Sequence, residues 1–113
     1  MNKQSITVID YGMGNLWSVQ SALRYLGCNP TISGDPDEII SANPLSLPGV
    51  GSFRKAMIAL KRLGLDQAII QAVQTKGSKI LGICLGMQLM GSNSSEDGDS
   101  VGLGLIPGVV DKF

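Results

Sequence analysis

Short apolar segments alternate along this chain with segments of helical periodicity, and this alternation is the strongest constraint on how the chain can fold. Strands are predicted over residues 5–10, 30–33, 45–47 and 79–83. Helices are predicted over residues 16–26, 35–40, 52–63, 66–75 and from residue 85 onward. Because the strands are nearly continuously apolar, both faces of the sheet should be covered, as in parallel sheets built from crossover units. The sequence therefore predicts an α/β fold with a parallel sheet flanked by helices.

Residues with capping preferences mark the ends of the predicted helices. Asn15 and Ser52 suit an N-cap, and Gly27 suits the end of a helix. Residues 91–100 are polar and are predicted to form a surface loop, and residues 109–113 to begin a further strand. Apolar side chains at helical spacing should form the inward faces. These are Leu16, Val19, Leu23 and Leu26 in the first helix, Phe53, Ala56, Met57, Leu60 and Leu63 in the third, and Ile69, Ile70 and Val73 in the fourth.

Composition restricts the partners and the compartment that the chain can have. Its 113 residues, 43% of them hydrophobic, are enough for one domain over residues 1–113. Nine basic residues balance nine acidic ones, which argues against a nucleic-acid partner. No apolar run approaches the roughly 20 residues of a membrane span, so we expect no membrane partner and a cytoplasmic location. Cys28 and Cys84 are expected to stay reduced there, with Cys28 in the core.

Three glycine-bearing loops each follow a predicted strand. They cover residues 12–14, 49–51 and 82–86. The carboxyl ends of parallel strands lie at one edge of a sheet, and ligands of α/β proteins gather there. We therefore expect the three loops to share one rim and to form the functional site.

Cys84 is the candidate nucleophile of this rim. It stands between Gly82 and Gly86, after a strand and before a helix, as in a nucleophile elbow, where the glycines would relieve crowding at a turn with strained backbone angles. A helix N-terminus favours a thiolate, and amides in the turn after residue 47 could face an oxyanion. The alternative is a small buried cysteine in a tight turn. No histidine is present to act as its base.

Four segments together carry a family resemblance. They are residues 9–16 (IDYGMGNL), 47–53 (LPGVGSF), 82–89 (GICLGMQL) and 102–108 (GLGLIPG). In this order they resemble the glutaminase-subunit family of imidazole glycerol phosphate synthases, which are class I, triad-type glutamine amidotransferases. The resemblance spans residues 6–113 and corresponds to the first half of such a subunit. It implies a class I glutamine amidotransferase-like, flavodoxin-like fold that is truncated at its C-terminal side.

The resemblance also implies a reaction and a set of site residues. Glutamine would be hydrolysed to glutamate and ammonia, and the ammonia would pass to a β/α-barrel cyclase subunit that forms imidazole glycerol phosphate in histidine biosynthesis. No cofactor and no metal are implied. Cys84 would be the nucleophile, Val50, Gly51 and Leu85 would supply the oxyanion site, Gly49 and Gln88 would lie against glutamine, and Gly12, Met13, Gly14 and Asn15 would form the partner face. Without the resemblance, Gln88 reads equally well as an ordinary polar helix residue, and the glycines at 12 and 14 as a tight turn.

Some positions depart from the family pattern. The family's catalytic histidine and glutamate belong to a C-terminal part outside these 113 residues, so the polypeptide alone is expected to be inactive. Ser46 falls within a predicted buried strand, Trp17 replaces a basic residue at the partner face, and residues 90–92 (MGS) differ from the expected continuation. Two alternatives therefore stay open. One is an amidotransferase subunit for sugar amidation in surface polysaccharide synthesis, and the other is a non-catalytic remnant that binds a cyclase-like barrel.

Overall fold

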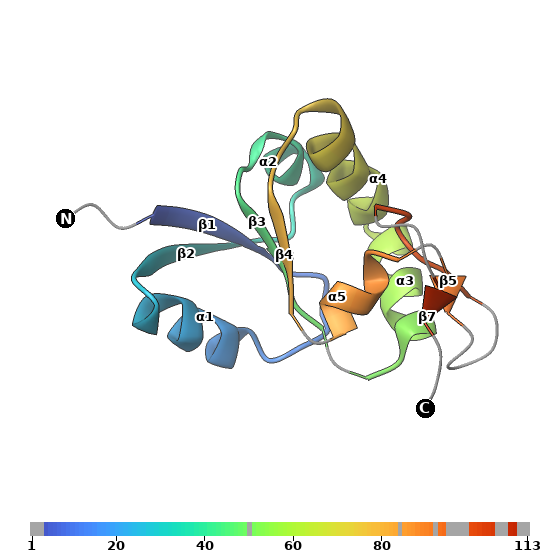
Figure 1. Ribbon diagram of the computed structural model, residues 1–113, viewed down its shortest axis with the longest axis horizontal. Helices are drawn as coiled ribbons and strands as arrows, with labels where there is room; N and C mark the ends of the chain where they lie inside the picture. The colour runs from blue at the N-terminus through green and yellow to red at the C-terminus, as the bar shows by residue number, and fades with distance from the viewer. Residues whose placement is uncertain are drawn as a thin grey trace.

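The computed structural model describes residues 4–49, 51–83, 85–91, 93–94, 100–105 and 109–110 of the chain. Its centre is a four-stranded parallel sheet with the strand order β2-β1-β3-β4 (Figure 1). The strands are β1 (Gln4–Ile9), β2 (Cys28–Ser33), β3 (Leu45–Leu47) and β4 (Ile80–Gly82). The helices are α1 (Leu16–Tyr25), α2 (Pro36–Ser41), α3 (Phe53–Arg62), α4 (Leu65–Ile70), the π-helical turn η1 (Gln71–Thr75) and α5 (Leu85–Leu89). The predicted α/β class and parallel sheet are confirmed.

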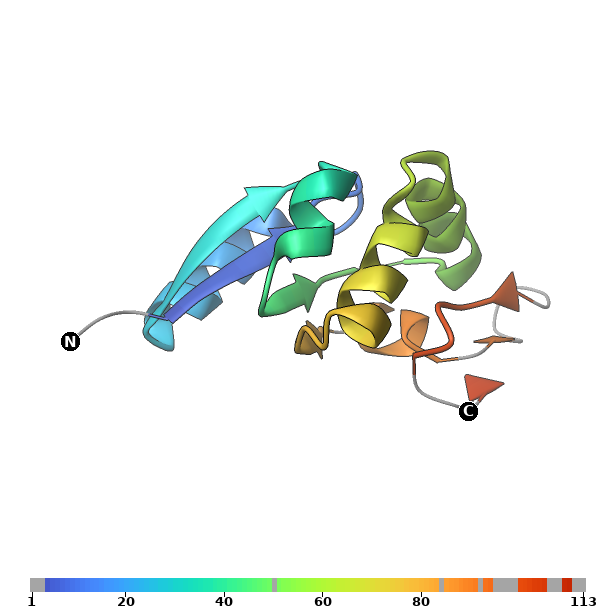
Figure 2. The same ribbon diagram turned by 90° about the horizontal axis from the view of Figure 1, so that it is seen from above.

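Helices cover both faces of the sheet, but they cover them unequally. On one face α1 packs against β1 and β2, where Ile6, Val8 and Leu23 form a small core. On the other face the remaining helices bury Ile9, Leu45 and many helical side chains in a larger core. In the turned view, β1, β2 and α1 lie at one end of the molecule, and α3 and α5 lie toward the other (Figure 2).

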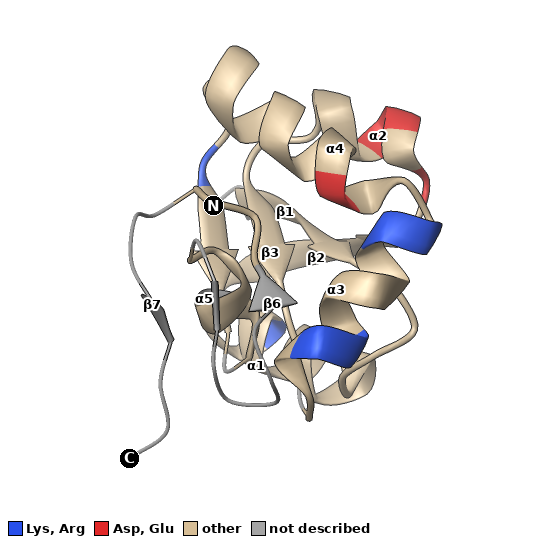
Figure 3. Ribbon diagram, turned by 90° about the vertical axis from the view of Figure 1, so that its right-hand side faces the viewer, with Lys and Arg blue, Asp and Glu red and all other residues tan. Residues whose placement is uncertain are grey.

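The predicted helix caps are present and explain where the helices begin. The side chain of Asn15 accepts a hydrogen bond from the Ser18 amide, and that of Ser52 accepts one from the Lys55 amide. Gly27 follows α1 with a φ of 89°, a conformation that favours glycine. Acidic residues lie in the first turns of α2 and α4, and basic residues in the last turn of α3, in accordance with the helix dipole (Figure 3).

Two predicted inward-facing leucines are exposed instead. Leu26 is 73% exposed and Leu63 is 41% exposed. Each is the C-cap residue of its helix, so the helical spacing that placed the preceding side chains no longer holds at these positions. The other predicted positions of α3, Phe53, Ala56, Met57 and Leu60, are buried as expected.

The segment after α5 differs from the surface loop that the sequence predicted. A second, three-stranded sheet has the order β6-β5-β7 and consists of β5 (Asn93–Ser94), β6 (Ser100–Val101) and β7 (Val109–Val110). Two-residue strands bury too little to leave a periodicity that a sequence reading could detect. The start of the predicted last strand corresponds to β7, and residues 111–113 lie outside the described residues.

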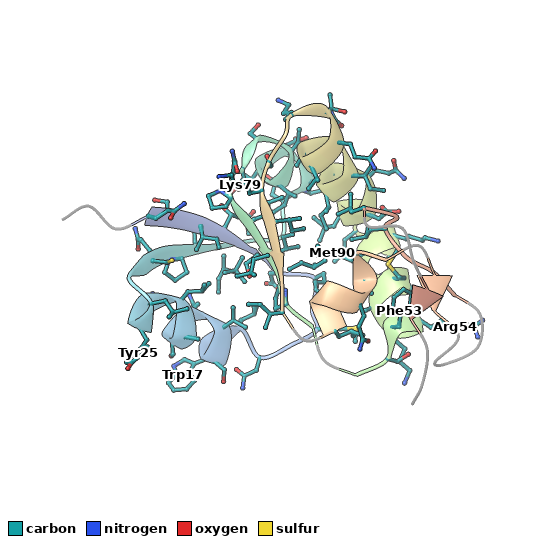
Figure 4. All side chains as sticks on the ribbon, in the orientation of Figure 1. Trp17, Tyr25, Phe53, Arg54, Lys79 and Met90 are labelled. Carbon is teal, nitrogen blue, oxygen red and sulfur yellow. The ribbon has the colours of Figure 1, made fainter. Side chains whose placement is uncertain are left out.

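Two further sequence expectations concern single side chains, those of Cys28 and Trp17. Cys28 is a free cysteine, half-buried against the smaller core. Trp17 projects from α1 away from the sheet and is 74% exposed. Tyr25 projects from the same helix in the same way (Figure 4).

Among the described residues, no helix is both long and apolar enough to cross a lipid bilayer.

Ser46 is the polar residue that the sequence placed inside a buried strand, and it is fully buried in β3. It pairs with Val8 of β1 and Leu81 of β4, so its side chain shares the α1 face with theirs. Its Oγ has no hydrogen-bond partner among the described residues. A buried hydroxyl without a partner carries a desolvation cost of about 1–3 kcal/mol.

We predict that Ser46→Ala raises the free energy of unfolding by about 1 kcal/mol, because it removes that cost and almost no volume. Ser78→Ala is the matched control, since the Ser78 hydroxyl donates to the Ala42 carbonyl at 2.8 Å. The control should lower the free energy of unfolding by about 1 kcal/mol. Urea denaturation measures both, and equal destabilisation by the two variants would contradict the account.

Candidate active site

The loops that follow β1, β3 and β4 meet at the carboxyl edge of the sheet, so the predicted common rim exists. The Ile83 amide donates to the Leu47 carbonyl at 3.0 Å, and the Leu85 amide donates to the Gly49 carbonyl at 3.1 Å. A Cβ built on Gly14 would lie 3.6 Å from the backbone of Gly49. The backbones of the three loops are therefore in direct contact.

The segment that carries the candidate nucleophile joins β4 to α5. Cys84 itself, like Val50 of the neighbouring turn, lies outside the described residues. The residues beside it are held firmly, because the Gly86 amide donates to the Ile83 carbonyl at 2.9 Å. Leu85 and Gly86 are both buried at the start of α5.

Glycine is required at position 86 because of crowding, as the sequence suggested. The φ of Gly86 lies outside the left-handed region, so the requirement is not one of backbone conformation. A Cβ at this position would overlap the carbonyl oxygen of Leu47, a backbone atom of β3 that cannot move aside. Gly86 therefore permits the start of α5 to touch the end of β3.

We predict that Gly86→Ala lowers the free energy of unfolding by at least about 3 kcal/mol, because β3 and α5 would have to separate. Gly77→Ala is the control: a Cβ there meets no atom within 4 Å, although the φ of 72° is strained for alanine. That strain should cost only about 1–2 kcal/mol. Chemical denaturation compares the two variants, and similar losses would show that crowding at Gly86 is unimportant.

Gly49 is a second tightly enclosed glycine of the rim. A Cβ built on it would overlap the hydroxyl of Tyr11 and would lie 3.3 Å from both the Gly86 nitrogen and the Leu85 Cβ. Gly51, two residues further, is exposed and has a φ of 91°. The turn after β3 thus has one buried, enclosed glycine and one exposed glycine in the left-handed region.

Tyr11 is a residue of this rim to which sequence reasoning gave no role. It is 1% exposed, and its hydroxyl donates to the Pro48 carbonyl at 2.6 Å across 37 positions of sequence. Burial raises the pKa of Tyr11 from the ordinary 10.0 to about 12, so the hydroxyl stays protonated and able to donate further into the alkaline range than an exposed tyrosine. The sequence shows only an aromatic residue between a predicted strand and a glycine loop. That pattern does not reveal that the Pro48 carbonyl accepts from the Tyr11 hydroxyl.

This pKa shift predicts a loss of stability in alkali. The unfolded phenol ionises near pH 10 and the folded one near pH 12, so the stabilisation is complete below pH 10 and disappears as the pH rises to 12. The wild-type free energy of unfolding should therefore fall, relative to that of Tyr11→Phe, by roughly 2–3 kcal/mol over this range. Urea titrations at several pH values measure the difference, and parallel curves for the two proteins would refute the shift.

The predicted partner face, residues 12–15, is in contact with the turn after β3. Gly12 and Gly14 have φ values of 85° and 101°. A Cβ on Gly51 would lie 3.9 Å from the terminal methyl of Met13, which is half-buried against the larger core. Asn15 is exposed and caps α1. The face where a partner is expected therefore adjoins the expected substrate site directly.

The remaining predicted site residues lie on α5. Gln88 is half-buried there. The Leu85 amide, which the family resemblance implied as an oxyanion donor, already donates to the Gly49 carbonyl. An oxyanion could therefore accept a hydrogen bond from this amide only after the bond between the amide and the Gly49 carbonyl is broken.

A cavity of about 240 Å³ opens beside this rim, between α1 and the ends of β3 and β4. Its walls are mainly apolar. They are formed by Asn15, Ser18, Val19, Ala22, Pro48, Gly49 and Ile83. Among the described residues, no group of three or more acidic, cysteine or histidine side chains is arranged to hold a metal ion.

Residues 7–101 match the family described as Glutamine amidotransferase class-I. This range covers most of the chain and contains all three loops of the rim. The chain therefore belongs to the class-I glutamine amidotransferase family.

Within this family the chain is similar to subunits of one enzyme. It is 55% identical over 108 residues to the imidazole glycerol phosphate synthase subunit HisH of Geobacillus thermodenitrificans, which covers 96% of this chain and 50% of that subunit. The HisH subunit of Chlorobium luteolum is 51% identical over 108 residues, covering 96% and 53%. The chain thus spans about half the length of the curated relatives it matches.

A solved structure supports the fold alone. The chain superposes on a putative peptidase E protein from Listeria monocytogenes with a TM-score of 0.69 and 18% sequence identity. The superposition covers 93% of this chain and 65% of the other. The flavodoxin-like architecture expected from the sequence is confirmed by this likeness.

Proposed function

We propose that these 113 residues form the nucleophile-bearing N-terminal part of the glutaminase subunit of an imidazole glycerol phosphate synthase. In this role the protein hydrolyses glutamine and supplies ammonia to a cyclase subunit in histidine biosynthesis, in the cytoplasm. The observation that carries the proposal is the meeting of three glycine loops around the turn at position 84, in a chain about half identical to HisH subunits.

The reaction assigns a task to each part of the rim. The Cys84 thiolate attacks the side-chain amide carbon of glutamine, and the tetrahedral intermediate carries its negative charge on oxygen. Collapse of this intermediate breaks the carbon–nitrogen bond; the departing nitrogen takes up the proton that the thiol gave up and leaves as ammonia, and a γ-glutamyl thioester remains. Water then hydrolyses the thioester to glutamate and restores the thiol. Gly49 and Gln88 flank the bound glutamine.

The negative charge requires backbone donors, which we assign to Val50, Gly51 and Leu85. The Leu85 amide is engaged by the Gly49 carbonyl at 3.1 Å, so catalysis requires this carbonyl to leave it and the oxyanion to take its place. The exposed, left-handed Gly51 gives the turn the backbone freedom that such an exchange needs. The partner face at residues 12–15 touches the same turn, which suits a subunit whose reaction is useful only beside a cyclase.

The reaction requires a base to move protons between the thiol, the leaving nitrogen and water. The usual base is a histidine, and these 113 residues contain none. A cysteine with a pKa near 8.5 is only partly ionised at neutral pH, and loss of general acid–base help costs roughly 100- to 10,000-fold in rate. Substrate recognition and thiol reactivity, in contrast, depend on the rim itself. They are therefore the properties by which this polypeptide can be tested.

We predict that a chloroketone analogue of glutamine alkylates Cys84 in this polypeptide at least about tenfold faster than it alkylates Cys28, because only the former would lie in a glutamine site. Peptide mass spectrometry locates and times the modification. Free glutamine should protect Cys84, and asparagine should not.

Two variants and a second readout complete this test. Cys84→Ser should abolish the glutamine-protected modification, and Cys28→Ser, which alters a half-buried thiol of the smaller core, should leave it unchanged. Steady-state release of ammonia is not expected from this polypeptide in either case. Equal labelling of both cysteines without protection by glutamine would overturn the proposed function.

A further inference from the structure

The hydroxyl of Tyr11 lies at the centre of the contact between the three loops. The ring belongs to the larger core and would pack equally well as phenylalanine, so packing alone does not require the oxygen. The oxygen donates to the Pro48 carbonyl at 2.6 Å, and Pro48 is itself fully buried. A buried carbonyl that lost this donor would have no water to replace it.

The hydrogen bond determines the orientation of one peptide group. The Pro48 carbonyl and the Gly49 amide belong to the same planar unit, so a fixed carbonyl direction also fixes the direction of the amide. The next carbonyl, that of Gly49, is held at 3.1 Å by the Leu85 amide. Tyr11, from the loop after β1, therefore fixes the peptide group that precedes Gly49. Leu85, at the start of α5, fixes the peptide group that follows it.

The same hydroxyl connects this turn to the loop that follows β1. Tyr11 directly precedes Gly12, and the loop also touches the turn through Gly14 and Met13. Among the described residues, a displacement of residues 12–15 can therefore act on the turn through the Tyr11 bond and through these two contacts. Of these three links, the one through the Tyr11 hydroxyl is a hydrogen bond to a peptide group of the turn.

We infer that Tyr11 is a positioning residue: its hydroxyl holds the Pro48–Gly49 peptide in place, so that rearrangement of the turn is confined to the bonds that follow the Gly49 Cα. The assignment of the turn as an oxyanion and substrate site rests on the proposed function. The structural part of the inference does not, because it concerns hydrogen bonds of described residues. It makes Tyr11 a hydrogen-bonded link between the expected partner face and the expected substrate site, beside the packing contacts of Met13 and Gly14.

Tyr11→Phe tests this role, and Tyr25→Phe, which removes a hydroxyl from a side chain that is 91% exposed, is the matched control. Hydrogen exchange by NMR reports two amides: that of Leu85, bonded to Gly49, and that of Leu45, bonded to the Lys79 carbonyl at 2.8 Å. Tyr11→Phe should accelerate exchange at Leu85 at least about tenfold more than at Leu45. The control should change neither.

Two results would overturn the inference. Unchanged exchange at Leu85 would mean that the hydroxyl does not hold the turn. Equal acceleration at both amides would mean that it contributes only to global stability. If Tyr11→Phe does not fold, the wild-type protein decides: the Tyr11 hydroxyl proton should be protected from solvent exchange and that of Tyr25 should not, and an unprotected Tyr11 proton refutes the bond.

The link to the reaction is measured separately with the chloroketone analogue of glutamine. Tyr11→Phe should slow the maximal rate of Cys84 alkylation at least about fivefold with little change in the half-saturating concentration, while the rate with a small neutral thiol reagent stays the same. An unchanged maximal rate would refute the link to the substrate site. If the wild-type protein shows no glutamine-protected labelling, the proposed function fails, and the exchange experiment still decides the role of Tyr11.

Discussion

The rim depends on one close backbone contact, between the end of β3 and the start of α5. The carbonyl of Leu47 lies where a Cβ of residue 86 would be, so this contact exists only because residue 86 is glycine. It brings the Leu85 amide within 3.1 Å of the Gly49 carbonyl and the Ile83 amide within 3.0 Å of the Leu47 carbonyl. These bonds in turn set the position of the chain on both sides of Cys84.

The expected substrate site and the expected partner face are parts of one packed unit. Met13 and Gly14 of the expected partner face lie against the turn that contains Gly49 and Gly51. Interiors packed this closely transmit displacements instead of absorbing them. A protein bound at residues 12–15 would therefore act on the expected substrate site without an intervening element.

Much of the fold could be predicted because it is encoded locally. The side chains of Asn15 and Ser52 cap helices from within three residues, and the buried positions of α3 follow its periodicity. Prediction failed where local order ends. Leu26 and Leu63 follow the last helical turn and are exposed, and the two-residue strand β5 leaves no detectable pattern.

The sequence by itself determined that this is a parallel α/β protein and that three glycine loops share a rim, because strand periodicity and loop glycines depend on neighbouring residues. The place of Cys84 in that rim stays a prediction from the sequence. Only the tertiary structure decided which hydrogen bonds and contacts those loops make with one another. The acceptor of the Tyr11 hydroxyl is 37 positions away, the Leu85 amide is occupied by Gly49, and Ser46 finds no partner among the described residues. Each of these depends on atoms brought together from different strands, and a sequence pattern does not specify which backbone group will be opposite a given side chain.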